Sequence, residues 1–281
     1  LGNLHCLKEI AFTNCEDLDV ESLSGLSFPK ATSLTLVGNT SISVQKALLR
    51  MCPTLLCYSS SWAKKVDLNE LPHSVQSVCA HGCELMRMTS VKDTVEKLTV
   101  RDCVIHESVL ASVVACCPHV RDLHLERIGF HTESIMFMLG EAYGERLQRL
   151  SIFHCKSVPG GGEICLFEKC TALTYLNLGK SSNTDGMYLA TVLYYNPTLR
   201  TLDLSHSKVT DDTLMLLVAA ASELETLIMC DSSGYTEEGL FALIQGCASL
   251  KLLVVEEKII SLLWGHSWDI MRPDLQVRAF V

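Results

Sequence analysis

The stretch from Leu199 to Ser207 reads L-R-T-L-D-L-S-H-S and is followed by Thr210-Asp211-Asp212. Its core is L-x-x-L-x-L, and the x-L-x-L-x part predicts a short strand because alternate side chains of a strand point to the same face. Thr210 is a good residue to precede a helix. One such stretch fits many folds, so its recurrence along the chain decides what it means.

The same pattern recurs from one end of the chain to the other, with copies 20 to 27 residues apart. This period is that of a leucine-rich repeat, in which each unit buries its apolar face only against its neighbours. The first apolar positions are Leu7, Ala31, Leu55, Val75, Val95, Val120, Leu147, Leu173, Leu199, Leu224, Leu250 and Leu275.

The second and third apolar positions keep the same phase in most copies, as in Leu150/Ile152 and Leu202/Leu204. Tyr58/Ser60 and Arg278/Phe280 are weak copies. We therefore predict an α/β fold, a single leucine-rich-repeat solenoid over residues 1–281 with about eleven repeats and a truncated C-terminal one. Its curved parallel sheet would lie on the concave face and its helices on the convex face.

Helical returns are predicted by apolar residues at i, i+3, i+4 and i+7. The clearest stripes begin at Leu110, Leu189, Leu214 and Leu240. Residues 55–94 hold two short repeats without a clean stripe, so we expect irregular or 3₁₀ returns and lower rigidity there. Residues 259–281 form the predicted C-terminal cap, in which Trp264, Trp268 and Phe280 would cover the last apolar edge.

The composition excludes some kinds of partner. The chain has 281 residues, a formal net charge of −9 and a pI of about 5.6. Nucleic acid and anionic membranes attract basic surfaces, so neither is expected as the main partner. No run of 18 apolar residues is present to span a bilayer.

Eight of the fourteen cysteines fall in two fixed positions of the repeat. Cys52, Cys117, Cys170 and Cys247 lie three residues before a first apolar position, and Cys15, Cys83, Cys103 and Cys155 lie eight residues after one. Such periodic placement indicates small buried side chains or residues that satisfy a turn, rather than metal ligands. No C-x-x-C pair is present to begin a zinc site.

These cysteines carry a family resemblance. The motifs Cys52-Pro53-Thr54-Leu55, Cys117-Pro118-His119-Val120 and L-x-x-L-x-L-x-x-C over Leu147 to Cys155 resemble the cysteine-containing repeats of F-box/LRR ubiquitin-ligase substrate receptors. In that family the repeats bind the protein to be ubiquitinated, and an N-terminal F-box binds the Skp1 adaptor. The resemblance implies Skp1 and cullin as partners reached through an unseen upstream F-box. The resemblance implies a reducing compartment, cytoplasmic or nuclear. Since Leu1 is not an initiator Met, we expect an unseen upstream segment.

No catalytic, cofactor or metal set is predicted. Residues 160–162 form a glycine triplet without the Lys and Ser/Thr of a phosphate loop. G-x-S-x-G and H-E-x-x-H are both absent. Acidic pairs such as Asp211-Asp212 lie at predicted helix starts, where they favour the helix dipole. The sequence thus predicts a protein that is not an enzyme.

The predicted binding surface is the concave face. Residues two, four and six positions after the first apolar residue point away from the helices, and the seventh lies at the rim. Arginine and aromatic side chains are enriched at binding hot spots. The candidate partner-binding residues are Arg101, His124, Arg127, Arg149, Phe153, His154, Tyr175, Asp203 and His206.

Other interpretations stay open at this stage. The same face could be a solvated surface with mutually paired charges, such as Lys97–Asp122 or Arg101–Glu126. The solenoid could be a permanent structural scaffold of a large assembly instead of a receptor. A GTPase-regulating repeat protein is a further alternative, although no motif specifically favours it.

Overall fold

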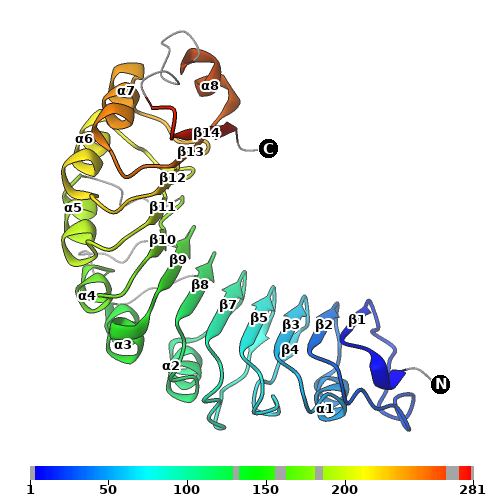
Figure 1. Ribbon diagram of the computed structural model, residues 1–281. Coiled ribbons are helices and arrows are strands. Elements are labelled where there is room, and N and C mark those ends of the chain that lie inside the picture. The colour runs from blue at the N-terminus through cyan, green and yellow to red at the C-terminus, as the bar shows by residue number, and fades with distance from the viewer. Residues whose placement is uncertain (1–3, 129–132, 156–162, 181–185, 264–271, 280–281) are drawn as a thin grey trace. The chain divides into compact units, whose positions relative to one another are not determined.

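The computed structural model describes residues 4–128, 133–155, 163–180, 186–263 and 272–279. The chain divides into two compact units, Leu1–Ile128 and Gly129–Val281, here unit 1 and unit 2. Each is built from parallel strands joined by return segments (Figure 1).

Unit 1 contains one parallel sheet that follows chain order, together with a small second sheet. The main strands are β1 (Glu9–Thr13), β2 (Ser33–Val37), β3 (Cys57–Ser61), β5 (Ser77–His81), β7 (Lys97–Arg101) and β8 (Asp122–Glu126). Leu34 aligns with Tyr58, and Leu98 aligns with Leu123. The predicted repeat phase is therefore confirmed even at the weak copy, where Tyr58 and Ser60 are buried.

Unit 2 repeats this arrangement. Its strands are β9 (Arg149–Phe153), β10 (Tyr175–Asn177), β11 (Thr201–Asp203), β12 (Thr226–Ile228), β13 (Leu252–Val255) and β14 (Gln276–Ala279). Leu176, Leu202, Leu227 and Leu253 form one inward row and are fully buried. The parallel strand order and this register confirm the predicted leucine-rich-repeat fold class.

The last repeat corrects one prediction. Leu253 pairs with Val277, so Val277 and Ala279 take the inward positions assigned above to Arg278 and Phe280. Arg278 is exposed, as expected because a buried unpaired guanidinium is costly. The repeat is one residue shorter than its phase predicted. Phe280, Trp264 and Trp268 lie outside the described residues.

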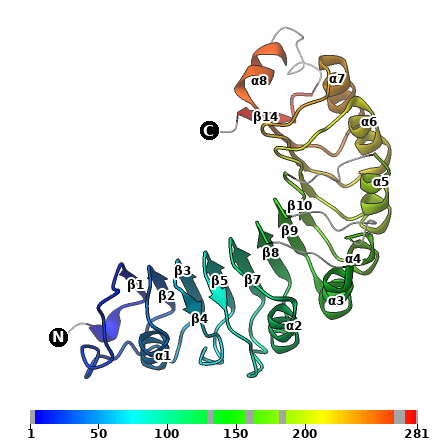
Figure 2. The ribbon, with the colours of Figure 1, turned by 180° about the vertical axis from the view of Figure 1, so that it is seen from behind.

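Helices line one face of the main sheet in each unit (Figures 1 and 2). We call the opposite face the open face. In unit 1 the helical elements are η1 (Leu4–Cys6), α1 (Ile42–Met51) and α2 (Glu107–Cys116). In unit 2 they are α3 (Glu133–Tyr143), η2 (Gly144–Arg146), α4 (Glu163–Lys169), α5 (Gly186–Tyr195), α6 (Asp211–Ala220), α7 (Glu237–Gly246) and α8 (Glu257–Leu263).

The helices α6 and α7 begin where the sequence predicted. The Thr210 side chain accepts a hydrogen bond from the Thr213 backbone N–H, and the Thr213 hydroxyl oxygen accepts one from the Thr210 backbone N–H. Thr236 caps α7 in the same way through the Gly239 N–H. These bonds satisfy N–H groups that a helix start otherwise leaves open.

The two returns between β3 and β7 have a different construction. No helix occurs in this part of the described chain. Instead β4 (Lys65–Val66) and β6 (Glu84–Leu85) pair in parallel as a second, two-stranded sheet. We expected irregular or 3₁₀ returns here; residues 57–97 contain no 3₁₀ helix, and the second sheet was not predicted. Lower rigidity in this segment stays a prediction.

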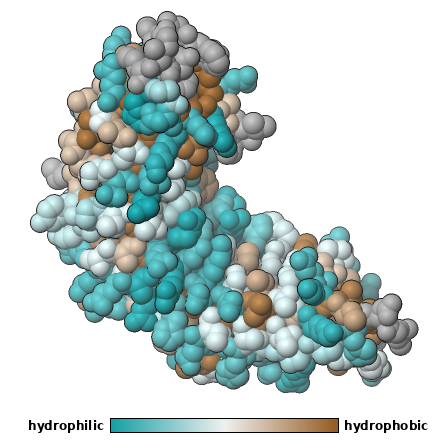
Figure 3. Space-filling model, viewed as in Figure 1, coloured by the Kyte–Doolittle hydropathy of each residue, from teal (hydrophilic) through white to brown (hydrophobic). Residues whose placement is uncertain are grey.

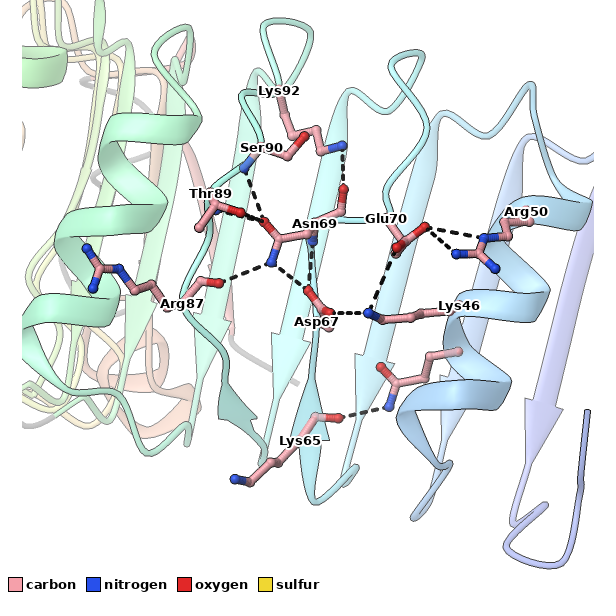
Figure 4. Close-up of polar contacts among 11 residues, drawn as sticks. Lys46, Arg50, Lys65, Asp67, Asn69, Glu70, Arg87, Thr89, Ser90 and Lys92 are labelled. Atoms are coloured by element: carbon pink, nitrogen blue, oxygen red, sulfur yellow. Dashed lines mark hydrogen bonds and ion pairs between the residues drawn. The ribbon is translucent and has the colours of Figure 1, made fainter.

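A polar network replaces the missing helices (Figure 4). The Asn69 Oδ1 accepts from the backbone N–H groups of Thr89 at 2.7 Å and Ser90 at 3.1 Å. Its Nδ2 donates to the Asp67 carboxylate at 2.7 Å and to the Arg87 carbonyl at 3.1 Å. One asparagine therefore ties two successive returns together.

Lys92 completes this network from the next repeat. Its side chain is buried, and its ammonium donates to the carbonyls of Asn69 at 2.8 Å and Leu71 at 2.6 Å. On the other side, Lys46 of α1 pairs with Asp67 at 2.9 Å. The network thus runs from α1 across both helix-free returns.

The cysteines behave as the periodicity predicted. Cys52, Cys117, Cys170 and Cys247 are buried, and burial raises the pKa of each thiol. All fourteen cysteines are free thiols. The four buried cysteines therefore act as small core side chains rather than as crosslinks.

Candidate protein-interaction surface

A row of backbone turns ends the strands in both units. The residue seven positions after the first apolar residue has a positive φ in every repeat from the first to the tenth; we call these residues the rim. In unit 1 they are Asn14, Gly38, Trp62, Gly82, Asp102 and Arg127, and in unit 2 His154, Lys180, His206 and Asp231. Rim N–H groups bond to the next repeat, for example His206 to the Cys230 carbonyl at 2.7 Å.

Large side chains at the rim are unfavourable for the backbone. Glycine adopts positive φ without steric penalty, whereas other L residues there cost on the order of 1–2 kcal/mol each. Gly38 and Gly82 show that the turn accepts glycine. Trp62, Arg127 and Lys180 adopt φ values of 62°, 49° and 56°. The turn does not require these side chains, so they call for another explanation.

Trp62 is the largest exposed side chain at the rim of unit 1. It is 57% exposed, and its ring lies 4.5 Å from the His81 ring, centroid to centroid. A Cβ on Gly82 would lie 2.3 Å from the Trp62 ring. Gly82 therefore serves two needs, because it forms the turn and leaves room for the indole.

A chain of charged contacts continues from His81 along the rim of unit 1. His81 Nε2 lies 3.0 Å from the Asp102 carboxylate. The same carboxylate accepts a bidentate pair of hydrogen bonds from the Arg127 guanidinium. Arg127 contacts Glu126, and Arg101 pairs with Glu126 at 3.0 Å. The bonds from Arg127, opposed by a smaller effect of burial, lower the pKa of Asp102.

The open face of β7 and β8 carries a second set of paired charges. Asp122 contacts Lys97 at 3.3 Å and His124 at 2.7 Å. Burial alone would raise the pKa of Asp122, but the bonds and charges of His124 and Lys97 outweigh it and lower the pKa. The paired-charge interpretation of Lys97–Asp122 and Arg101–Glu126 is therefore correct as geometry. These pairs fix where each charged group points.

Unit 2 presents aromatic rings on its open face and rim. The Arg149 guanidinium lies 4.0 Å from the centroid of the Tyr175 ring. Phe153 lies edge-on to His154 and His206, at centroid distances of 6.3 Å and 6.1 Å. These contacts place an arginine–tyrosine pair and an aromatic cluster on the same unit.

Gly179 makes room for the Phe153 ring. A Cβ at Gly179 would lie 2.8 Å from that ring. Asn177 accepts from the Gly179 N–H at 2.7 Å and donates to Asp203 at 2.9 Å, and Asp203 in turn accepts from the Ser205 N–H at 2.9 Å. Asp203 therefore braces the open face from a half-buried position.

The nine predicted residues divide between the two units. Arg101 and Arg127 meet through Glu126 in unit 1, where His124 joins the neighbouring Asp122 pair. In unit 2 the predicted residues Arg149, Phe153, His154, Tyr175, Asp203 and His206 form the contacts above. The repeat pattern places Asp102 at the rim, whereas Trp62 and His81 were missed. The signal was present, because Trp62 occupies the rim position of a weak repeat copy.

The chain is similar to an internalin C2 from Listeria monocytogenes. The TM-score is 0.44 at 16% identity, over 65% of this chain and 72% of that one. A second similar structure is the TLR13–ssRNA13 complex, with a TM-score of 0.43 at 14% identity, over 89% of this chain and 44% of that one. At these values neither similarity bears on function, and the fold rests on the strand register above.

No protein-family model and no curated protein matches the chain. Among the described residues, no group of three His, Cys, Asp or Glu side chains could hold a metal ion. None of the helices in the described ranges has the length and apolar character needed to cross a bilayer.

Proposed function

We propose that the chain is a protein-recognition module whose partner contacts the rim and the open face. The observation that carries this proposal is the rim itself, where non-glycine residues hold a backbone conformation that glycine adopts without penalty. Strained residues of this kind cluster at functional sites. Their side chains lie at the carboxyl ends of the strands, where a partner can reach them.

The side chains at the rim are of the types that binding surfaces use. Tryptophan, tyrosine and arginine dominate binding hot spots. The Trp62 ring packs against Gly82, and the Arg127 side chain is held by Asp102 and Glu126. On the side of unit 1 shown in Figure 3, hydrophobic residues appear as separate spots among hydrophilic ones. Binding through a few anchors suits this surface better than one broad apolar contact.

More specifically, we propose that the chain is the substrate-recognition subunit of an SCF-type ubiquitin ligase in the cytoplasm or nucleus. It rests on the cysteine-containing repeat motifs quoted above and is supported by the free thiols, which suit a reducing compartment. An F-box on an upstream segment would bind Skp1 and cullin. The repeats would then hold the protein to be ubiquitinated.

The recognition proposal is tested by quantitative affinity capture with the full-length chain. Trp62→Ala and Arg127→Glu should each deplete the same set of captured proteins at least about tenfold, the loss of a hot spot worth about 1.4 kcal/mol or more. Val91→Ala is the control, since Val91 is 49% exposed and lies outside the rim. Unchanged capture by both rim variants would overturn the proposal.

The ligase proposal needs a separate experiment. Full-length protein should co-purify with Skp1 and cullin, and removal of the segment upstream of Leu1 should abolish this association. Both rim variants should leave it unchanged, because the adaptor would bind the F-box. Full-length protein that binds neither Skp1 nor cullin would exclude the ligase role without touching recognition by the repeats.

A further inference from the structure

Two cysteines of unit 1 lie opposite each other directly after the rim. Cys83 and Cys103 occupy the same position in successive repeats, and their sulfur atoms are 3.5 Å apart. Backbone hydrogen bonds flank the pair, from the Gly82 N–H to the Arg101 carbonyl at 2.9 Å and from the Val104 N–H to the Cys83 carbonyl at 3.2 Å. The two residues are therefore held in register.

Other cysteines in this repeat position have different partners. The Cys15 thiol donates to the Thr13 carbonyl at 3.3 Å, and the Cys155 thiol donates to the Phe153 carbonyl at 3.6 Å. Each bonds within its own repeat, to a carbonyl two residues back along the chain. Cys83 and Cys103 bond to each other across two repeats, which gives this pair a chemistry that the shared position alone does not.

The surroundings of the two thiols shift their pKa values in opposite directions. The hydrogen bond from Cys83 lowers the pKa of Cys103, and backbone groups near Cys83, Arg101 and Gly82 add to this effect. The same bond and burial raise the pKa of Cys83. Because the thiolate is the reactive form of cysteine, Cys103 is the residue that an oxidant would modify first.

We propose that Cys83 and Cys103 are an oxidative modification site at which a small hydroperoxide converts the two thiols into a disulfide. The Cys103 sulfur attacks one peroxide oxygen, the O–O bond breaks, and the leaving hydroxide takes the Cys103 thiol proton to become water. The Cys83 sulfur then attacks the Cys103 sulfur and the S–O bond breaks. The second hydroxide takes the Cys83 proton, so two electrons pass from the sulfurs to the peroxide.

The geometry allows this bond. Adjacent strands lie about 4.8 Å apart, and disulfides bridge Cα atoms about 4.4–6.8 Å apart. The sulfurs must approach by about 1.5 Å to reach the disulfide length of about 2.05 Å. Cys83 is 4% exposed and Cys103 7% exposed, so a molecule as small as hydrogen peroxide suits the site and bulky thiol reagents do not.

Oxidation would act on the rim because the pair adjoins two rim residues. Cys83 follows Gly82, on which Trp62 rests, and Cys103 follows Asp102, which holds His81. A shift of Cys83 would therefore move Gly82, against which the Trp62 ring packs, and a shift of Cys103 would move Asp102 and its contact with His81. The consequence for partner binding rests on the proposed function, whereas formation of the disulfide does not.

The test is peroxide treatment of the reduced, purified chain, followed by trypsin digestion and mass spectrometry. The expected product links the peptide Val66–Arg87 to the peptide Asp102–Arg121 with loss of two hydrogens. Cys83→Ala and Cys103→Ala should each abolish this product, and Cys15→Ala should leave it intact. Wild-type protein in which both thiols stay alkylatable, or in which Cys103 becomes sulfinic acid without the crosslink, would overturn the proposal.

A second readout connects the bond to the rim. Peroxide should change the intrinsic fluorescence of the wild-type chain, and dithiothreitol should reverse the change. Trp62→Phe should lose most of that response while still forming the crosslink. A crosslink that leaves the Trp62 emission unchanged would refute the effect on the rim, and the outcome is the same whether or not a partner binds there.

Discussion

Two kinds of return segment bring the chain back to the next strand, and they reach stability by different means. In unit 2 the returns of β11 and β12 are the helices α6 and α7, which bury Leu214, Leu217, Leu240 and Leu243 almost completely. In unit 1 the returns of β3 and β5 have no helix in the described chain, and polar bonds around Asn69 and Lys92 join them. Both kinds of repeat have a parallel strand that pairs with its neighbours and a rim residue with a positive φ.

The difference shows which parts of the repeat are interchangeable. The strand must keep its phase, because a slip of one residue turns every side chain to the other face. The return needs only to satisfy its backbone groups and cover the core. A helix spreads this work over many apolar contacts, whereas the network of unit 1 concentrates it on a few side chains.

The largest expected effect is at the centre of the network. Asn69→Ala removes bonds to Thr89, Ser90, Asp67 and the Arg87 carbonyl. Leaving several of these groups unpaired should lower the free energy of unfolding by about 2–4 kcal/mol. Urea denaturation measures this loss. Arg50→Ala, at the exposed end of the same network, should cost less than about 1 kcal/mol, and equal losses would contradict a concentrated network.

The next effect concerns the buried lysine. Lys92→Met keeps the volume but leaves the carbonyls of Asn69 and Leu71 without a donor, and should cost about 1–3 kcal/mol. Burial holds the pKa of Lys92 below the ordinary value of 10.5. The unfolded chain therefore binds the proton more readily, so the wild type gains stability relative to Lys92→Met as the pH rises towards 10.5. Denaturation curves at pH 7 and pH 9.5 should show a wider gap at the higher pH; a narrower one would be inconsistent with this account.

A smaller effect is expected at the start of a helical return. Thr210→Ala removes the cap and the reciprocal bond with Thr213, and such losses cost about 1 kcal/mol. The apolar contacts of α6 should hold the return in place. Thermal unfolding of Thr210→Ala and Asn69→Ala side by side tests the comparison, which fails if the cap variant is the less stable of the two.

The sequence predicted the strands well because their signal is local. Leu202 and Leu204 repeat in phase with a defined period, and burial follows from that period. The prediction for the last repeat was wrong because Leu275 keeps the phase of the earlier repeats. The inward residue after it, Val277, comes one residue earlier than the pattern requires. The polar network was not predicted because Asn69 bonds to Arg87, Thr89 and Ser90, which lie in the next return and leave no periodic pattern in the sequence.

The binding surface was predictable in part. Alternation along a strand identifies the residues of the open face, so Arg101, Phe153 and Tyr175 could be found. Which charges pair depends on rotamers that the pattern does not specify. Trp62 was missed because it follows a weak repeat copy, although its place seven residues after Leu55 assigns it to the rim.

The central claim is that rim side chains are kept for recognition at a cost to the backbone, and Lys180 tests it most directly. Lys180 is exposed and has a φ of 56°. Lys180→Gly should raise the free energy of unfolding by about 0.5–1 kcal/mol, because relief of strain exceeds the added entropy of the unfolded chain. Lys180→Ala, which keeps the Cβ, should leave it unchanged. A glycine variant less stable than the wild type would contradict the claim.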